Sequence, residues 1–311
     1  MTGSAGRPRW RGVDGILLYD KPLHVSSNQA LQRVRRLFQA EKAGHTGSLD
    51  PLASGMLPLC FGSATKVCAY LLDSDKVYTA RLALGARTST GDREGEVVET
   101  AAVPASLDLE AACARLTGQI RQIPPMYSAL KKDGERLYAL ARRGEEVPRE
   151  ARTVTVHSLA ARRLNEVTLE LRVHCSKGTY VRTLGEDLAL ALGTVGHLAS
   201  LHRDWVAPFR GAPLVTDALL AAAQAAGDGA LLGLLQPVEA ALPDWPRIDL
   251  EPGAAEDIRH GRAVAHPLPP AEAERFVRLH AGATLLALGR IAPGATEVAP
   301  IRLLGTAAGV R

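Results

Sequence analysis

One short stretch of the sequence combines a carboxylate, a histidine and several turn-forming residues. It reads GHTGSLDPLASG, from Gly44 to Gly55, and its carboxylate is Asp50. Pro51 follows directly, which removes one backbone N–H and disfavours the helical region for Asp50. The glycines permit turns and a close approach of a ligand to the backbone. We therefore expect Asp50 on a stiff, non-helical loop, where its carboxylate is a candidate reactive group.

Turn chemistry alone explains much of this stretch, because an Asp side chain often hydrogen-bonds to the backbone of its own turn. It explains less well why His45 and Asp50 flank the turn just before the apolar run MLPLCFG. The residues themselves leave both interpretations open, a simple connector or a loop that presents a catalytic carboxylate.

The composition is that of a globular protein. The chain has 311 residues, of which 46% are hydrophobic and 23% charged, so it can bury a sizeable core and form more than one domain. The formal net charge of +4 permits a polyanionic partner without proving one. Aromatic residues make up only 4% of the chain, so a surface that stacks on bases must use few rings.

Several functional classes lack their sequence signals. The four cysteines form no C-x-x-C pair, so zinc and redox motifs are unsupported and buried thiols in a reducing compartment are expected. The N-terminus has no apolar segment of a secretory signal. Polar residues interrupt the Ala- and Leu-rich stretch 214–242, so no membrane span is expected there. We expect a cytoplasmic protein.

Hydrophobic periodicity predicts an α+β fold with a mixed, largely antiparallel sheet flanked by helices. No G-x-G-x-x-G or G-K-[ST] phosphate loop is present. We expect a polar loop at 86–95. The expected strands are 15–22, 56–61, 76–84, 167–175 and 197–206, and the expected helices are 26–38, 65–72, 107–116 and a segment that ends near 192.

Composition also divides the chain. Residues 1–12 are expected to form a disordered basic tail, 13–245 the main domain, and 246–311 a small β-rich module that follows a Pro-Asp-Trp-Pro linker. Within the main domain, segment 121–152 holds eight basic against five acidic residues and has no clean strand period. Long loops in compact domains are often functional, so we expect this segment to be a mobile inserted arm.

The stretch GHTGSLDPLASGMLP closely resembles the catalytic motif of the bacterial tRNA pseudouridine-55 synthases, the TruB-type family. Six further segments resemble that family in the same order, and together they cover most of residues 13–206: DKP, SSNQALQRVRR, YLLDSDKVY, QIPPMYSALK, VPREAR and HCSKGTYVRTL. A long motif with six ordered blocks is a specific signal. By position and size, the C-terminal module resembles the PUA-like RNA-binding domain that is common in this family.

The resemblance implies a pseudouridine-synthase fold that isomerises uridine to pseudouridine at position 55, in the T arm of tRNA. The N-glycosidic bond breaks, the uracil turns, and a new C–C bond forms to its C5. The target base must leave its stack to reach a pocket. The reaction consumes no oxidant and no external group, so the resemblance implies no cofactor and no metal. We expect tRNA as the partner, and a monomer without an obligate protein partner.

The resemblance also assigns the centre of the site. Asp50 matches the family's essential aspartate and would be the nucleophile. Arg182 matches the arginine that pairs with it, and an opposing cation offsets the desolvation of a buried carboxylate. Tyr78 matches the active-site tyrosine, whose ring can stack on uracil and whose hydroxyl is expected near the C5 proton. Tyr180 and Leu201 match positions that line the uracil pocket.

Four further residues are implied at the edge of the site. His45 matches the motif histidine that assists displacement of the nucleotide from its stack, although a structural loop histidine is an alternative. Lys21 and Lys177 would support the pocket or contact phosphates, and Asp92 would contact the substrate.

Two other functions fit parts of the sequence. A non-catalytic tRNA-binding or RNA-folding protein could use the same basic surface, but it would be expected to lose Asp50, Tyr78 or Arg182, and all three are present. A glycoside or nucleoside hydrolase usually needs two cooperating carboxylates, and no second one stands out in the sequence beside Asp50.

Overall fold

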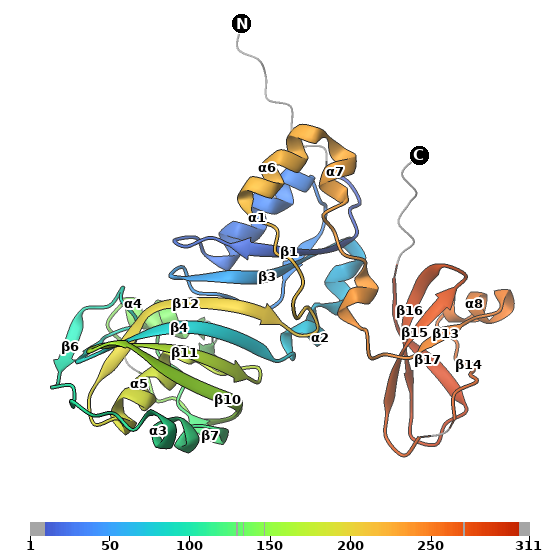
Figure 1. Ribbon diagram of the computed structural model, residues 1–311. Coiled ribbons are helices and arrows are strands. Elements are labelled where there is room, and N and C mark those ends of the chain that lie inside the picture. Colours follow the sequence, from blue (N-terminus) through green and yellow to red (C-terminus); the bar gives the residue numbers. More distant parts are fainter. Residues whose placement is uncertain (1–9, 129, 133, 146, 270, 305–311) are drawn as a thin grey trace, which may run out of the picture.

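The computed structural model describes residues 10–304 apart from 129, 133, 146 and 270 (Figure 1). Residues 1–9 of the expected basic tail therefore lie outside the described residues. At Arg11 the chain is already attached to the main domain, which differs from the expectation of a tail through residue 12. Its guanidinium donates to the Phe38 carbonyl oxygen at 3.0 Å and forms an ion pair with Asp228.

One eight-stranded sheet organises the main domain, in the order β1-β3-β12-β4-β11-β10-β7, with β2 beside β3. All neighbours are antiparallel except β3 and β12, which confirms the mixed, largely antiparallel sheet. Its strands are β1 (Gly15–Lys21), β2 (Ala43–His45), β3 (Ala53–Phe61), β4 (Lys76–Leu84), β7 (Gly118–Gln122), β10 (Arg152–Asn165), β11 (Thr168–Cys175) and β12 (Gly196–Val206).

Strand β1 shows why its sequence is a continuous apolar run. Leu17 and Tyr19 belong to the large core on one face of the sheet, whereas Ile16 and Leu18 belong to a second core on the other face. A strand that is covered on both faces needs apolar residues at every position rather than at alternate ones.

The large core is closed by helices at both ends of the sheet. Figure 1 shows α1 grouped with α6 and α7 beside β1, and α3 and α5 beside the β10–β11 end. Helix α1 begins with the expected capping box, since Ser26 accepts from the Gln29 backbone N–H and Gln29 accepts from that of Ser26. The helices are α1 (Ser27–Phe38), α3 (Leu109–Arg115), α5 (Val181–Ala191), α6 (Asp217–Ala226) and α7 (Asp228–Leu232).

Two local expectations were only partly right. The expected helix 65–72 is a 3₁₀ segment, η1 (Gly62–Val67), followed by the short α2 (Cys68–Leu72). The Thr65 hydroxyl donates to the Gly62 carbonyl oxygen at 2.7 Å and so favours this tighter turn. The expected loop 86–95 begins with β5 (Ala86–Thr88), which pairs with β6 (Val97–Thr100). Both strands are too short for a visible period.

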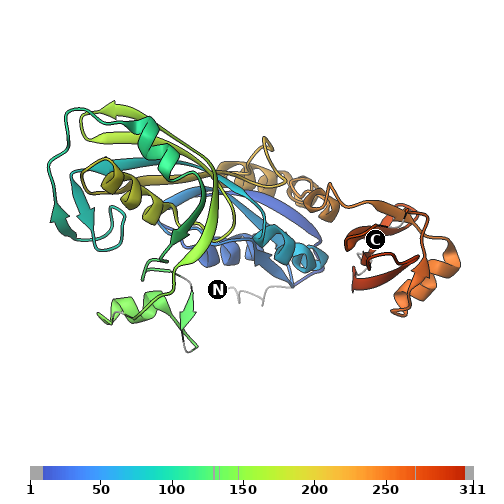
Figure 2. The same ribbon diagram turned by 90° about the horizontal axis from the view of Figure 1, so that it is seen from below.

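An arm leaves the sheet between β7 and β10. It contains the paired strands β8 (Lys131–Lys132) and β9 (Glu135–Arg136), followed by α4 (Leu137–Arg142). Figure 2 shows this arm projecting from the body of the main domain. Near its base, Arg149 Nη1 donates to the Pro124 carbonyl oxygen at 3.1 Å.

The C-terminal module has its own five-stranded sheet, in the order β13-β15-β16-β17-β14. This confirms the small β-rich domain that the sequence predicted. Leu288 and Leu304 of the module also pack into the second core of the main sheet. Its elements are η2 (Val238–Ala241) in the connection, β13 (Arg247–Asp249), α8 (Pro252–Arg259), β14 (Val264–Ala265), β15 (Arg275–Ala281), β16 (Thr284–Ile291) and β17 (Glu297–Leu303).

In the part of the chain that the structure describes, no helix combines enough length with enough apolar character to cross a bilayer.

Candidate active site

The loop that carries Asp50 connects β2 to β3 and is pinned to the start of α1. The Ser27 hydroxyl donates to the Leu49 carbonyl oxygen at 3.0 Å and accepts from the Leu49 N–H at 2.7 Å. Gly55 has a φ of +102°, and a Cβ there would lie 2.3 Å from the Arg203 carbonyl oxygen. Only glycine allows this approach of β3 to β12. Asp50 therefore lies on a fixed, non-helical loop.

Arg182 joins two carboxylates. Its Nη2 lies 2.9 Å from Asp50 Oδ2, and its Nη1 lies 3.4 Å from Asp92 Oδ2. The same guanidinium donates to the backbone carbonyl oxygens of Thr90 at 2.7 Å and Tyr127 at 2.6 Å. The side chains of Arg182 and Asp92 are only 5% and 4% exposed, whereas that of Asp50 is 43% exposed. The arginine is held from behind, and Asp50 remains accessible.

Asp50 and Arg182 border a pocket of about 300 Å³, within the size range of small-ligand sites. The predicted residues Tyr78, Tyr180 and Leu201 also line it. Tyr78 lies on β4 and Leu201 on the neighbouring β12, and their alternating positions face the same side of the sheet. The structure thus brings five of the nine predicted site residues into one cavity.

The arm is connected to this pocket through Tyr180, which precedes α5. The Gln122 side chain accepts from the Tyr180 N–H at 2.8 Å and donates to its carbonyl oxygen at 3.1 Å. Together with the Tyr127 carbonyl that holds Arg182, this places the base of the arm in direct contact with the site.

The other four predicted residues do not line the pocket. Lys21 is buried at the end of β1, where burial lowers its pKa to about 8 although Asp50 opposes the shift. His45 lies on β2, and its buried Nδ1 has no hydrogen-bond partner among the described residues. Lys177 forms an exposed ion pair with Asp73 at 2.8 Å. Asp92 is buried behind Arg182 and contacts that arginine rather than the cavity.

Sequence reasoning missed two cations that line the pocket, Lys76 and Arg203. Burial, followed by the charge of Arg203, lowers the pKa of Lys76 to about 8. A signal for both was present. Lys76 precedes Tyr78 by two residues, and Arg203 follows Leu201 by two, so the strand period of two places each cation on the face of a predicted pocket residue.

Arg203 is the larger omission. It is 1% exposed, and it donates to the backbone carbonyl oxygens of Met56 at 2.7 Å and Gly47 at 3.0 Å. It lies directly opposite Tyr78 in the β4–β12 register. Burial raises the pKa of Tyr78, and the charge and hydrogen bond of Arg203 oppose that rise. A buried cation therefore faces the tyrosine hydroxyl.

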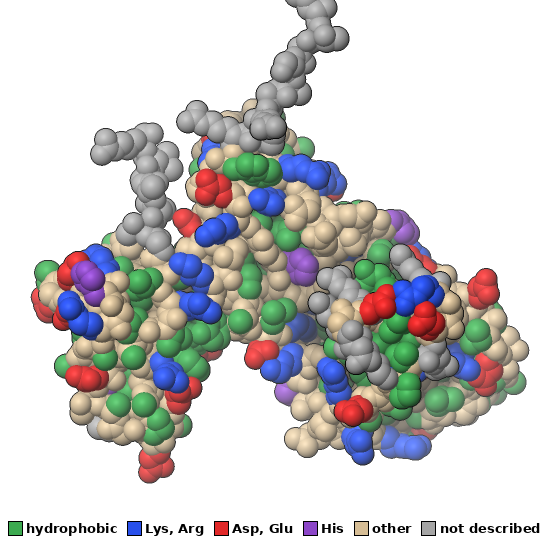
Figure 3. All heavy atoms as spheres, turned by 180° about the vertical axis from the view of Figure 1, so that it is seen from behind, with side chains coloured by type: hydrophobic (Ala, Val, Ile, Leu, Met, Phe, Trp, Pro, Cys, Tyr) green, Lys and Arg blue, Asp and Glu red, His purple; other side chains and the backbone are tan. Residues whose placement is uncertain are grey.

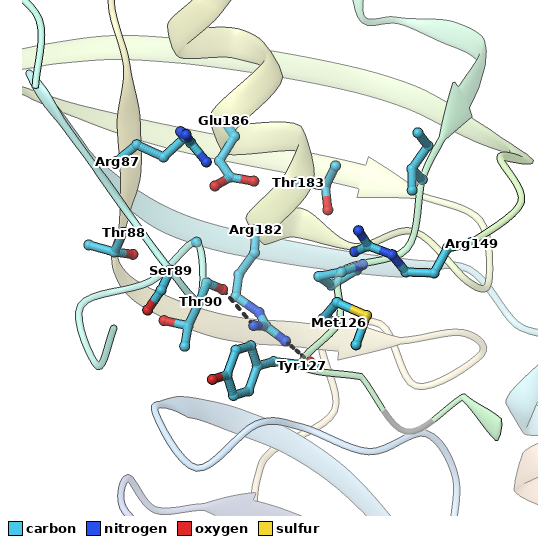
Figure 4. A pocket seen from close by; sticks show the side chains of 13 residues that line it. Arg87, Thr88, Ser89, Thr90, Met126, Tyr127, Arg149, Arg182, Thr183 and Glu186 are labelled. Atoms are coloured by element: carbon cyan, nitrogen blue, oxygen red, sulfur yellow. Dashed lines mark hydrogen bonds between the residues drawn. The ribbon is translucent and has the colours of Figure 1, made fainter. Parts of the chain in front are cut away.

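A second pocket of about 310 Å³ lies on the other side of Arg182. Figure 4 shows Arg182 reaching across it to the backbone at Thr90 and Tyr127, with Arg87, Glu186 and Arg149 around the rim. Arg182 lines both pockets. The residues around the second pocket hold its guanidinium in the orientation that faces Asp50.

Sequence comparison assigns the chain to a family. The N-terminal domain of the TruB family pseudouridylate synthases matches residues 35–181, and the C-terminal domain of tRNA pseudouridylate synthase B matches 182–243. The tRNA pseudouridine synthase B of Burkholderia lata is 49% identical over 315 residues, covering 99% of this chain and 96% of the relative. That of Pseudomonas putida strain GB-1 is 49% identical over 296 residues, covering 94% and 96%.

Solved structures share the fold. A chain of a Cbf5-Nop10-Gar1 complex aligns with a TM-score of 0.72 at 24% identity, covering 96% of this chain and 91% of that one. A chain of an H/ACA RNP bound to a substrate RNA containing 2′-deoxyuridine aligns at 0.71 and 21%, covering 97% and 92%. At this identity the likeness shows the fold alone, and that fold agrees with the family matches. The chain belongs to the TruB family of pseudouridylate synthases and is an enzyme of the isomerase class.

Proposed function

We propose that the chain converts uridine to pseudouridine at position 55, in the T arm of tRNA, with Asp50 as the nucleophile. The observation that carries this proposal is the ion pair between Asp50 and Arg182 at the edge of the pocket. The arginine is buried and fixed, while the carboxylate remains open to a base that enters the cavity. The names of the relatives, tRNA pseudouridine synthase B, support tRNA as the substrate.

The pocket walls suit a flipped uracil. Tyr78 and Leu201 offer an aromatic and an apolar surface on adjacent strands, and Tyr180 closes a further side. Asp50 forms a covalent bond to the substrate as the N-glycosidic bond breaks, the uracil turns within the cavity, and its C5 bonds to the sugar. The bond to Asp50 breaks again before the product leaves. C5 loses its proton and N1 gains one, so the net reaction is an isomerisation.

Tyr78 is the group that we assign to the C5 proton. Its burial favours the neutral hydroxyl, which works against proton acceptance. Arg203, opposite it in the sheet, supplies the positive charge that stabilises the phenolate, which is the form that can accept the proton. We therefore add Arg203 to the site as a residue that acts through Tyr78.

The remaining predicted residues receive supporting roles. Because Asp92 is buried and contacts Arg182, we assign it to positioning that arginine rather than to substrate contact. Lys21 adds positive charge that acts on Asp50, His45 assists displacement of the nucleotide, and the exposed Lys177 contacts phosphate. A hydrolase with two catalytic carboxylates fits the geometry poorly, because the second carboxylate does not reach the cavity.

The tRNA-binding surface is proposed to include the arm. Figure 3 shows Lys and Arg side chains on both sides of the hollow between the C-terminal module and the main domain, which suits recognition of RNA by shape and phosphate contacts.

Because the base of the arm holds Tyr180 and Arg182, the test of the arm should remove only its tip, residues 131–145. Replacing the tip by a glycine linker should weaken tRNA binding and flatten its salt dependence. Unchanged binding throughout a salt titration would contradict this role.

We further propose that the chain acts in the cytoplasm as a monomer without an obligate protein partner. Nop10 and Gar1 are partners in the solved Cbf5 complex, and this proposal assigns neither to the present chain. Sedimentation of the purified chain with tRNA should give a single copy per tRNA that is active without added protein, and activity only in a larger assembly would contradict this.

The catalytic proposal is tested with an unmodified tRNA transcript that carries tritium at C5 of its uridines. The wild-type chain should release one equivalent of tritium per tRNA without free uracil. Asp50→Asn should release none while it still binds tRNA. Asp257→Asn is a matched control, because Asp257 also pairs with an arginine, Arg262 at 2.6 Å, but on the C-terminal module.

The outcomes separate the alternatives. Release of free uracil would indicate a hydrolase. Binding of tRNA without tritium release by the folded wild type would indicate a binding protein. Release by Asp50→Asn at the wild-type rate would remove Asp50 as the nucleophile.

A further inference from the structure

Two histidines and an aspartate meet outside the catalytic pocket, where strands β4, β10 and β11 lie side by side. Their possible ligand atoms all lie within 4.8 Å of one another: Asp75, His157 and His174. Nε2 of His157 lies 3.2 Å, and Nε2 of His174 3.9 Å, from the same oxygen, Asp75 Oδ2. Both imidazoles thus present the same ring nitrogen to one point.

The backbone fixes each of the three positions. The β10–β11 register shifts between Val156 and Ser158, so that the bulge sets His157 beside His174 on the neighbouring strand. Their ring centroids are 4.6 Å apart. Asp75 immediately precedes β4, and its carbonyl oxygen accepts from the Ala207 N–H at 2.9 Å. The sheet therefore holds the two histidines, and a backbone hydrogen bond holds Asp75 where β4 begins.

The separations suit a metal ion. Imidazole nitrogens and carboxylate oxygens bind zinc at roughly 2.0–2.2 Å, and tetrahedral ligands at that distance lie about 3.4 Å from one another. The two separations from Asp75 fall on either side of this value. Small rotations of the side chains would bring all three atoms onto one ion.

The surroundings leave room for an ion. Trp205 packs against the His174 ring with centroids 5.4 Å apart and walls off one side. The three side chains are 34–42% exposed, so water can complete the coordination sphere.

We propose that Asp75, His157 and His174 bind one divalent transition-metal ion of the zinc and nickel type. Two nitrogen ligands discriminate against magnesium and calcium, which prefer oxygen. The next residue, Lys76, lines the catalytic pocket, and its Nζ donates to the Leu72 carbonyl oxygen at 3.2 Å. The bound ion would stabilise the turn 72–76 beside the pocket and takes no part in the isomerisation.

The test uses the untagged, metal-free chain. Calorimetric titration with Zn²⁺ should give one equivalent, and Zn²⁺ should raise the thermal midpoint while the same concentration of Mg²⁺ should not. His157→Ala and His174→Ala should each lower the Zn²⁺ affinity at least about tenfold and abolish the thermal shift. His260→Ala is the matched control, since that histidine lies 3.6 Å from one carboxylate, Glu256, on α8; it should bind Zn²⁺ as the wild type does.

Cobalt supplies the second measurement. Co²⁺ should give weak visible bands typical of nitrogen and oxygen ligands, and both histidine substitutions should remove them. Strong thiolate charge-transfer absorption would place the ion at a cysteine and overturn the proposal. So would the lack of saturable binding by the wild type, or binding that survives both substitutions. Circular dichroism shows whether each variant folds. If His174→Ala fails to fold, the His157→Ala variant decides the test, because the His157 side chain is partly exposed.

Discussion

Two buried arginines line the same pocket but are held in opposite ways. Arg182 contacts two carboxylates, Asp50 at 2.9 Å and Asp92 at 3.4 Å. Arg203 donates to the backbone carbonyl oxygens of Met56 and Gly47, and among residues 10–304 that the structure describes it forms no ion pair with a carboxylate. One positive charge is compensated and the other is not.

This difference indicates a division of labour in the site. The charge of Arg182 is matched by carboxylates, so its main effect is to fix the position of Asp50. The uncompensated charge of Arg203 instead acts on the groups around it. Burial is the largest cause of the pKa shift at each of these groups, and Arg203 adds a lowering effect at all of them: Tyr78, Lys76, His45 and Lys21.

The largest effect is expected from Arg182→Met, which removes the compensated cation. Asp50 then loses its fixed partner, and we expect turnover to fall by roughly 10³-fold, the size typical of a lost preorganised donor. Single-turnover tritium release measures the rate, and filter binding measures tRNA affinity, which should change little. A loss below about tenfold would show that Arg182 does not organise the nucleophile.

Asp92→Asn tests whether the compensation behind Arg182 matters. The amide keeps the shape of the side chain but removes one of the two negative charges. Arg182 should then shift toward Asp50 and displace that carboxylate from its working position. We expect turnover to fall by about 10-fold to 100-fold, as for other residues that orient a functional group, with unchanged tRNA affinity. A weaker affinity with normal turnover would instead return Asp92 to the substrate-contact role predicted from the sequence.

Arg203→Gln removes the uncompensated charge and should raise the pKa of Tyr78, because burial and the charges of Cys175 and Asp50 then act unopposed. The rate should then need a higher pH, with the acidic limb of the pH–rate profile shifted up by about one unit and the neutral rate reduced about tenfold. Arg203→Lys keeps the charge and should restore most of the profile. Superimposable profiles for both variants would separate Arg203 from Tyr78.

Lys76 links stability to pH, because burial and then the charge of Arg203 lower its pKa. Its folded-state pKa is about 8 rather than its usual 10.5, so between these values the unfolded chain binds more protons than the folded chain. The free energy of unfolding of the wild type should therefore rise relative to Lys76→Met as pH increases from 8 to 10.5, by up to about 3 kcal/mol. Urea unfolding at several pH values measures this difference, and a constant difference would place Lys76 in a more polar environment.

Strand periodicity predicted the scaffold of the site better than its contents. Residues 76–84 were expected as a strand, and β4 has those bounds, because alternation over nine positions is a strong local signal. The same alternation marks Lys76 and Arg203 as inward-facing. It does not say what lies beneath a strand, so the cation opposite Tyr78 appears only once β12 is placed beside β4.

The meeting of Asp50 with Arg182 could not be derived from local pattern. These residues are brought together by the sheet order, and the sequence indicated their pairing only through the family resemblance. Asp92 shows the same limit, since no second carboxylate stood out in the sequence beside Asp50, yet the fold places Asp92 on the other side of the shared arginine. Spatial neighbours that are distant in the chain leave no periodic trace.

The proposal that the pocket isomerises one uridine of the T arm is tested most directly by mapping the product. An unmodified tRNA transcript is incubated with the chain, and pseudouridines are located by chemical labelling and primer extension. The expected result is a single pseudouridine at position 55, and no product in a transcript that carries cytidine there. Pseudouridine at another position, or none while tRNA is bound, would contradict the proposal.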